Sequence, residues 1–298
     1  MDKSIFQTIV DERDYSATLS NICEQLEKYL KVNHINTMVL GISGGIDSTV
    51  VAAIANLIVQ ENPSMKLIGL SLPSSTNEGN ENIVAKQVVE EFCDFETSEI
   101  YNISDKIETI LGGLDVHNSS PLTIGNIKAR FRMMMLYDKA SKYKGIVLDT
   151  DNLSEHFLGF WTLHGDVGDY SPIGMLWKDE VYGLAEYLMT CPYFTKEQIK
   201  AIKDSYNLAP TDGNGVKEGG DMAQIAPGLT YFDVSKMLRY ITGAVKLGNF
   251  DEDAYYAYFK EYSMENKINV LQRYKRSEFK RKHLPLRVTN DINFELYF

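Results

Sequence analysis

The chain has 298 residues, of which 44% are hydrophobic and 24% charged, a composition typical of a globular enzyme with one large domain or two small ones. It has no positively charged leader and no apolar run of about 18 residues, so we expect neither secretion nor a membrane span and assign the chain to the cytoplasm. A formal net charge of -11 argues against a broad nucleic-acid surface, and three dispersed cysteines argue against a zinc ribbon, a redox pair or a disulfide framework.

Helical and strand patterns alternate along the first half of the chain. The predicted strands cover residues 38–42, 66–73, 98–103 and 145–149. The predicted helices cover residues 15–32, 81–92 and 126–142, and another helix begins near Val50. This alternation predicts an α/β fold with a doubly wound, mostly parallel sheet flanked by helices, in which ligands lie beyond the carboxyl ends of the strands.

The last part of the chain is mostly helical, from Phe232 to about Arg276. We therefore expect a single domain made of three parts. These are an N-terminal helical region over residues 1–34, an α/β core over residues 35–231, and a helical C-terminal region with a tail over residues 232–298.

A glycine-rich turn joins the first predicted strand to the helix that follows it. Gly44 and Gly45 allow the main chain to approach a ligand closely, and the N–H groups of the new helix favour an anion. A Walker loop would end in a lysine, but this turn has Asp47 instead, and a carboxylate beside phosphates requires a cation such as Mg²⁺ between them. The pattern predicts a pyrophosphate site, and the structural alternative is a turn in which Asp47 and Ser48 are ordinary helix N-cap residues.

The six residues Ser-Gly-Gly-Ile-Asp-Ser, from Ser43 to Ser48, resemble the pyrophosphatase loop of the ATP-pyrophosphatase (adenine nucleotide α-hydrolase) superfamily, which cleaves ATP between its α and β phosphates. Later segments resemble successive motifs of the NAD synthetase family and extend the resemblance from roughly Leu19 to Val288. These segments are Asn126–Met133, Thr150–Glu155, Gly159–Asp166, Ala209–Thr211 and Phe279–Arg281. The fold implied by the resemblance is the Rossmann-like α/β fold of that superfamily.

The resemblance implies that ammonia amidates nicotinic acid adenine dinucleotide (deamido-NAD) to NAD in two steps. The nicotinate carboxylate attacks the α-phosphate of ATP, and ammonia then displaces AMP from the acyl-adenylate. Positions that match the family's ATP ligands are Gly41, Ile42, Ser43, Gly44, Gly45, Ile46, Asp47, Ser48, Thr150, Lys178 and Thr211. Among these, Asp47, Lys178 and Thr211 match the catalytic positions, while Asp47 and Glu155 match the Mg²⁺ ligands. Arg130, Asp169 and Lys280 match residues that bind the dinucleotide.

Each assignment has a structural alternative. Arg130 could form surface ion pairs, and this is the reading we favour for Arg132. Glu155 could be a first-turn carboxylate favoured by a helix dipole, Lys178 a solvated side chain, and Thr211 a helix cap.

The departures from the family pattern concentrate on the dinucleotide. Leu163 stands where the family has a lysine and Phe279 where it has a histidine, and both lost groups contact the dinucleotide. In addition, Asp149 replaces a glycine, and Asp169 is matched across a one-residue gap. Two alternatives therefore stay open: an adenylating ligase that acts on another carboxylate, and a nucleotide-binding protein without turnover.

The resemblance also bears on nitrogen source and assembly. Only about forty residues precede the loop, whereas glutamine-using relatives carry a separate amidase domain, so we expect free ammonia as the donor. The resemblance further implies a homodimer that binds small molecules, with no nucleic acid or membrane partner. The glycine-rich, acidic segment from Asp212 to Gly220 is interpreted as a lid over the site.

Overall fold

The computed structural model describes residues 13–74, 79–114, 119–166, 168–210 and 220–282. These residues contain a four-stranded parallel sheet in the order β3-β2-β1-β4. The strands are β1 (Thr37–Gly41), β2 (Lys66–Ser71), β3 (Glu99–Ile100) and β4 (Ile146–Leu148). The parallel sheet predicted from the sequence is therefore confirmed.

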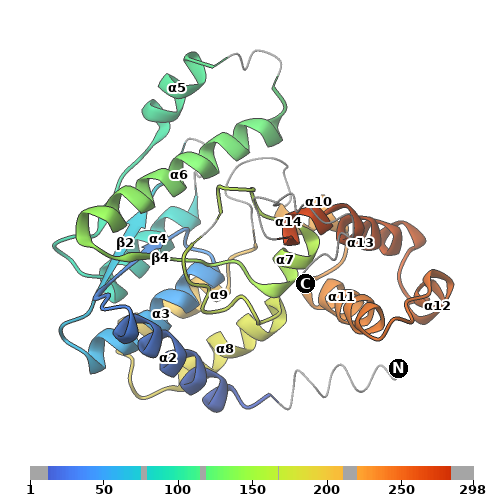
Figure 1. Ribbon diagram of the computed structural model, residues 1–298, viewed down its shortest axis with the longest axis horizontal. Helices are drawn as coiled ribbons and strands as arrows, with labels where there is room; N and C mark the ends of the chain where they lie inside the picture. The colour runs from blue at the N-terminus through green and yellow to red at the C-terminus, as the bar shows by residue number, and fades with distance from the viewer. Residues whose placement is uncertain (1–12, 75–78, 115–118, 167, 211–219, 283–298) are drawn as a thin grey trace, which may run out of the picture.

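Helices surround the sheet and make up most of the described chain (Figure 1). The first group is α2 (Tyr15–Val32), α3 (Ile46–Glu61), α4 (Asn80–Phe92), α5 (Ser104–Gly112) and α6 (Pro121–Tyr143). The second group is α7 (Leu153–Leu158), α8 (Lys178–Thr190), α9 (Lys196–Tyr206) and α10 (Gly220–Ile225). The last group is α11 (Tyr231–Lys246), α12 (Glu252–Tyr258), α13 (Met264–Arg276) and α14 (Glu278–Arg281). Within the described residues, no helix has the length and apolar character needed to cross a membrane.

Two predicted elements have different bounds in the structure. Helix α6 begins at Pro121 rather than at Asn126, because the Ser120 side chain caps it and Pro121 occupies the first turn. Gly125, just before the predicted start, therefore lies inside this helix. The predicted strand over residues 98–103 is reduced to the two residues of β3, which pair only with the end of β2.

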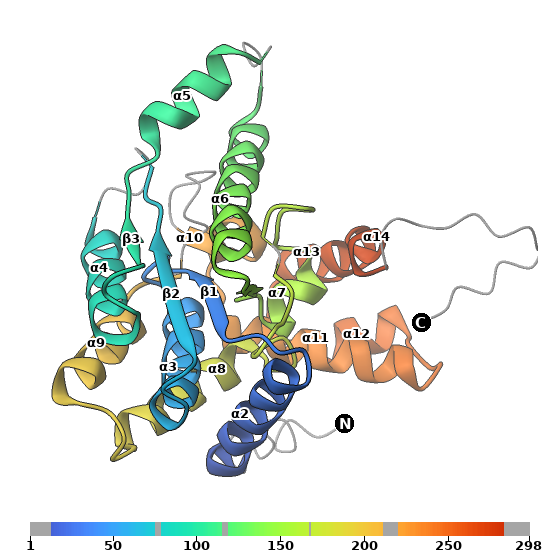
Figure 2. The same ribbon diagram turned by 60° about the vertical axis from the view of Figure 1, so that its left-hand side comes forward.

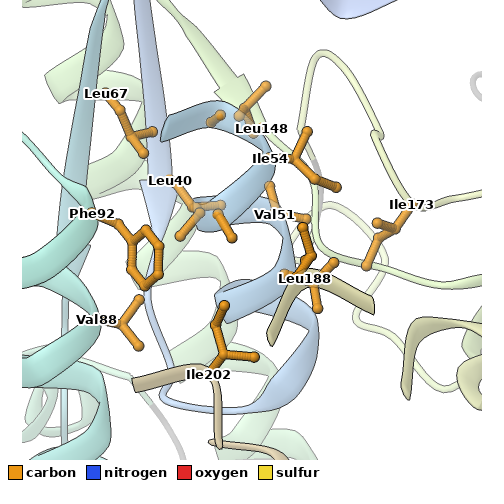
Figure 3. Packing of buried hydrophobic residues seen from close by; sticks show 14 of the residues in the cluster. Leu40, Val51, Ile54, Leu67, Val88, Phe92, Leu148, Ile173, Leu188 and Ile202 are labelled. Carbon is orange, nitrogen blue, oxygen red and sulfur yellow. The ribbon is translucent and has the colours of Figure 1, made fainter. Parts of the chain in front are cut away.

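Helices cover both faces of the sheet (Figure 2). The strand side chains accordingly alternate between two apolar layers. Met38 and Leu40 of β1 pack in a cluster with α2, α3, α4, α8 and α9. Val39, between them, packs in a second cluster with residues of α5 and α6. Figure 3 shows the first cluster around Leu40, Val51 and Phe92. The doubly wound α/β prediction is thus confirmed, and the sheet is held rigidly from both sides.

A third apolar cluster lies outside the sheet layers and is rich in aromatic side chains. Its fully buried members include Met237 and Leu238 of α11, Tyr255 of α12, Phe259 directly after α12, and Val270 of α13. The helices of this cluster lie together beside α7 and α8 (Figure 1). The helical C-terminal part therefore packs directly on the two helices that carry Glu155 and Lys178.

Candidate active site

The turn between β1 and α3 has a backbone shape that only glycine adopts easily. Gly44 has a φ of +87°, in the left-handed region. A Cβ added at Gly44 would lie 2.3 Å from the backbone oxygen of Glu81, at the start of α4. The turn therefore packs so closely against α4 that no side chain fits at position 44.

Hydroxyl groups hold this turn from both ends. Ser205 of α9 donates a hydrogen bond of 2.8 Å to the carbonyl oxygen of Gly44. Thr49 donates one of 3.0 Å to the carbonyl oxygen of Gly45, and its hydroxyl lies 3.0 Å from that of Ser205. The hydroxyls of Ser43 and Ser48 lie 3.2 Å apart across the turn. Because the first N–H groups of a helix have no acceptor within it, the fixed start of α3 is suited to bind an anion.

Three charged side chains meet beside the turn, each from a different helix. Lys178, at the start of α8, makes an ion pair with Asp47 of α3 through its Nζ atom. The same Nζ lies 3.2 Å from Oε1 of Glu155 on α7. The Lys178 side chain is 3% exposed, and those of Asp47 and Glu155 are 17% and 13% exposed. The solvated alternative for Lys178 does not describe this arrangement, in which a buried ammonium joins two carboxylates.

The two carboxylates fit the way in which proteins hold Mg²⁺. This ion is usually held by one or two carboxylates together with substrate phosphates and water, not by a complete protein cage. The described part of the chain has no group of three His, Cys, Asp or Glu residues able to hold a metal alone. Asp47 and Glu155 therefore suit a metal that arrives with a nucleotide, whose phosphates would give Lys178 a new partner.

One cavity of about 670 Å³ connects the turn with the rest of the site. Its lining includes Gly41, Ile42, Ser43, Gly45, Ile46, Asp47, Ser48, Thr150, Glu155, Lys178 and Lys280. Gly44 belongs to the turn but is not among the lining residues, and Thr211 and residues 212–219 lie outside the described residues. Lys280 donates from Nζ to the carbonyl oxygen of Gly159, at 2.7 Å, and to that of Trp161. The predicted ATP ligands other than Gly44 and Thr211 thus share a cavity with Lys280, one of the predicted acceptor ligands.

The other two residues assigned to the acceptor lie elsewhere. Arg130 is exposed, is not among the lining residues, and donates two hydrogen bonds, of 3.3 and 3.1 Å, to the carbonyl oxygen of Leu163. Asp169 is also absent from the lining, and it accepts hydrogen bonds from Tyr137 at 3.1 Å and from the Val147 N–H at 2.9 Å. In this structure both residues brace the backbone at the edge of the cavity.

Two arginines that the sequence did not assign line the cavity. Arg132 follows Ala129 on the face of α6 that borders it, and donates to the carbonyl oxygen of Leu72 at 3.0 Å. This location differs from the surface ion pair favoured for Arg132. Arg273, on α13, donates to the carbonyl oxygen of Gln224 at 3.1 Å. The spacing of the lining residues of α6, at Ala129, Arg132, Met133 and Leu136, is a helical repeat that points to Arg132 rather than to Arg130.

Three acidic side chains, Asp149, Asp151 and Asp166, also line the cavity. Burial raises the pKa of Asp149 to about 6, against hydrogen bonds from Ser171 and the backbone that favour the charged form. Burial also raises the pKa of Asp151, helped by the nearby charge of Asp149, and raises the pKa of Asp166 despite hydrogen bonds from Thr162. Three buried carboxylates with raised pKa values therefore lie together in the lining of the cavity.

Comparisons with known proteins show the family to which the chain belongs. The family model described as NAD synthase matches residues 18–284. The NH(3)-dependent NAD(+) synthetase of Campylobacter jejuni subsp. doylei is 31% identical over 185 residues, which cover 62% of this chain and 72% of the relative. That of Wolinella succinogenes is 36% identical over 182 residues, covering 58% of this chain and 65% of the relative.

Two solved structures are similar over almost the whole chain. The structure of NMN synthetase from Francisella tularensis has a TM-score of 0.68 and 25% identity, covering 93% of this chain and 98% of that one. The NH3-dependent NAD synthetase from Campylobacter jejuni has a TM-score of 0.66 and 23% identity, covering 93% of this chain and 100% of that one, a likeness of fold. With a family model that spans most of the sequence, the chain belongs to the NAD synthase family of enzymes.

Proposed function

We propose that this protein uses ATP and ammonia to amidate deamido-NAD to NAD, through an acyl-adenylate, with release of AMP and pyrophosphate. The observation that carries the proposal is the shared cavity. It joins an anion-binding turn, the Asp47, Glu155 and Lys178 cluster, and Lys280 on the acceptor side. Both reactants can therefore be held together, and proximity and electrostatics suffice without a nucleophilic side chain.

The proposed first step is the attack of the nicotinate carboxylate on the α-phosphorus of ATP. A new bond forms between the carboxylate oxygen and phosphorus, and the bond to the bridging oxygen breaks, so that its electron pair leaves with pyrophosphate. The turn from Ser43 to Ser48 and the start of α3 would hold that leaving group, and Lys178 would bind its oxygens. Mg²⁺, when held by Asp47 and Glu155, would neutralise charge that develops on the leaving group.

In the second step, the nitrogen of ammonia attacks the acyl carbon and AMP leaves. The ammonia nitrogen loses a proton as the amide forms. AMP would stay bound between the turn and the end of β4, where Thr150 lines the cavity. No further protein nucleophile is needed in this sequence, so the chemistry depends on how the chain orients three small molecules.

A second candidate is the amidation of nicotinic acid mononucleotide, which carries the same reacting carboxylate. Two observations favour it. Arg130 and Asp169, two of the three residues assigned to the dinucleotide, do not line the cavity. The Francisella tularensis protein, which is 25% identical and similar over nearly the whole chain, is an NMN synthetase.

One assay separates the candidates. Purified protein is given ATP, Mg²⁺ and ammonium with either deamido-NAD or nicotinic acid mononucleotide, and AMP, pyrophosphate and amide are measured together. We expect the three products in equal amounts, with a higher kcat/KM for the dinucleotide. A higher kcat/KM for the mononucleotide would establish the second candidate, and no AMP with either acceptor would contradict both.

Glutamine in place of ammonium should give no amide. The proposed homodimer is checked by sedimentation equilibrium of the same sample.

A further inference from the structure

Asn152 links the two carboxylates of the cluster, although nothing in the sequence assigned it a role. The residue lies directly before α7 and is completely buried, with an exposed fraction of 0%. Its Nδ2 atom donates a hydrogen bond of 3.0 Å to Oδ1 of Asp47, on α3. Its Oδ1 atom accepts from the N–H groups of Ser154 and Glu155, at 3.0 and 3.1 Å. A single amide therefore contacts one carboxylate directly and fixes the helix turn that carries the other.

The contact with Glu155 is reciprocal. Oε2 of Glu155 accepts a hydrogen bond of 3.2 Å from the N–H of Asn152, which completes a capping box. Oε1 of the same side chain faces Nζ of Lys178, at 3.2 Å. Asp47 is divided in the same way, because Oδ1 is held by Asn152 while Oδ2 pairs with Lys178. In both carboxylates one oxygen is anchored by Asn152 and the other faces the lysine.

The chemistry of the position explains why an amide is present. The side chain must accept hydrogen bonds from the helix N–H groups and donate one to a carboxylate in a buried place. Aspartate caps a helix as well as asparagine does, but its ionised carboxylate has no proton to donate. Serine also caps a helix, but its hydroxyl is too short to reach Asp47 while it caps. Only the amide meets both requirements with the backbone in this position.

The segment after Asn152 also places the lysine. The Ser154 hydroxyl accepts a hydrogen bond of 3.0 Å from the Lys178 N–H, and it lies 2.9 Å from the hydroxyl of Ser235 on α11. Residues 152–155 therefore touch α3, α8 and α11 at once, and Asn152 is the member of the segment that reaches Asp47.

We infer that Asn152 is a positioning residue for the metal and nucleotide site, which orients Asp47 by direct donation and Glu155 through the cap of α7. This inference rests on the function proposed above, in which Asp47 and Glu155 hold Mg²⁺. In other proteins, mutation of a group that holds a metal ligand in place lowers metal affinity or activity by about 10- to 100-fold. The role is therefore one of orientation. Loss of the Asn152 amide should lower the affinity for the metal ion, while the protein still folds.

The test compares Asn152→Ser and Asn152→Asp with the wild-type protein. Both substitutions retain a helix-capping residue and remove the donor to Asp47, and the serine variant, which buries no added charge, should retain most of its unfolding temperature. In the aspartate variant a like charge also faces Asp47 and drives its carboxylate out of position. We expect the Mg²⁺ concentration for half-maximal activity to rise about 10-fold or more, while the KM for the acceptor changes less than about twofold. The affinity of Mn²⁺ for the protein with a non-hydrolysable ATP analogue, measured by electron paramagnetic resonance, should fall in parallel.

A matched control separates orientation from helix capping. Asp251→Ala removes the cap of α12, where the Asp251 side chain accepts from the Ala254 N–H at 2.7 Å, and this helix is remote from the cavity. This variant should lose stability but retain wild-type Mg²⁺ and Mn²⁺ dependence. If both Asn152 variants retain the metal dependence of the wild-type protein, the inference is overturned. The proposed function would still hold in that case, provided that the wild-type protein forms the amide. If the wild-type protein forms no amide, Mn²⁺ binding in the presence of the ATP analogue still decides the role of Asn152.

Discussion

The two sides of the cavity are built in different ways. On the nucleotide side, the turn from Ser43 to Ser48 is a continuous segment between a buried strand and a buried helix, and Ser205 and the α4 backbone fix its shape. On the acceptor side, the lining comes from α6, the segment around residues 159–166, α13 and α14, which are far apart in the sequence. The first side depends on local geometry and the second on how distant helices pack.

This difference has a consequence for specificity. A turn fixed by backbone contacts has few ways to change without losing its anion site. A wall assembled from separate helices can exchange side chains while the chemistry beside it is retained. The departures at Leu163 and Phe279 belong to the segments of the acceptor side, and we therefore expect substitutions on the two sides to affect different kinetic constants.

The largest effect is expected for Asp47→Ala. This change removes a proposed metal ligand and leaves the buried Lys178 ammonium with Glu155 as its nearby carboxylate partner. Turnover should fall by about 100-fold or more, because the charge that develops on pyrophosphate loses its stabilising groups. Pyrophosphate release measures the effect, with circular dichroism to verify the fold. The control Asp204→Ala breaks the exposed pair of Lys200 and Asp204 and should leave turnover unchanged. Wild-type turnover of Asp47→Ala would remove the metal assignment.

The next effect is expected for Gly44→Ala. An alanine at a φ of +87° is strained, and its Cβ would meet the Glu81 backbone oxygen at 2.3 Å. We expect a loss of about 1–3 kcal/mol in the free energy of unfolding, together with a higher KM for ATP. Urea unfolding and initial rates measure the two changes.

Gly248→Ala is the matched control for this substitution. Gly248 also has a positive φ, of +68°, but a Cβ there would have no heavy atom within 4 Å. The control should lose about 1 kcal/mol from backbone strain, with an unchanged KM for ATP. Equal losses and equal KM values in the two variants would show that contact between the turn and α4 is unimportant.

Local patterns explain how much of the fold the sequence predicted. The helix over residues 15–32 and the parallel strands have clear periodicity, and the structure contains them. The predicted start of α6 at residue 126 was wrong, because the cap at Ser120 and the proline at residue 121 determine where the helix begins. The positions of Arg132 and Arg273 depend on how α6 and α13 pack around the cavity. That packing is a long-range property that no local window contains.

A smaller effect is expected for Asp149→Asn, and it should depend on pH. Burial raises the pKa of Asp149 from 3.8 to about 6 in the folded protein, so the folded state retains a proton that the unfolded chain has already released. The wild-type protein therefore loses stability as the pH rises from about 4 to about 6, whereas an asparagine does not titrate. At pH 7 the variant should be more stable by about 2–3 kcal/mol, and the difference should become small near pH 4. Thermal unfolding of both proteins across this pH range measures the difference in stability. A difference that stays constant with pH would contradict this explanation.

The smallest effects are expected on the acceptor side, where Leu163→Lys and Phe279→His restore the side chains of the family pattern. Leu163 is half-buried, and its carbonyl oxygen already holds Arg130 beside the cavity, so a lysine there adds a cation near the acceptor wall. We expect the KM for deamido-NAD to fall by about three- to tenfold, as one partly solvated charge pair allows. Phe279 is 55% exposed and is not among the lining residues, so its replacement should change the KM by less than about twofold.

The mononucleotide serves as the internal comparison for these two variants. If Leu163→Lys improves the dinucleotide alone, the added cation acts on the second nucleotide, and the acceptor side distinguishes the two substrates. If it improves neither acceptor, the loss of the lysine has no kinetic consequence in this chain, and Arg132 and Arg273 become the cations to test next. Both results are measured as changes in the KM for each acceptor. We expect kcat to stay unchanged, because the turn on the nucleotide side is left intact.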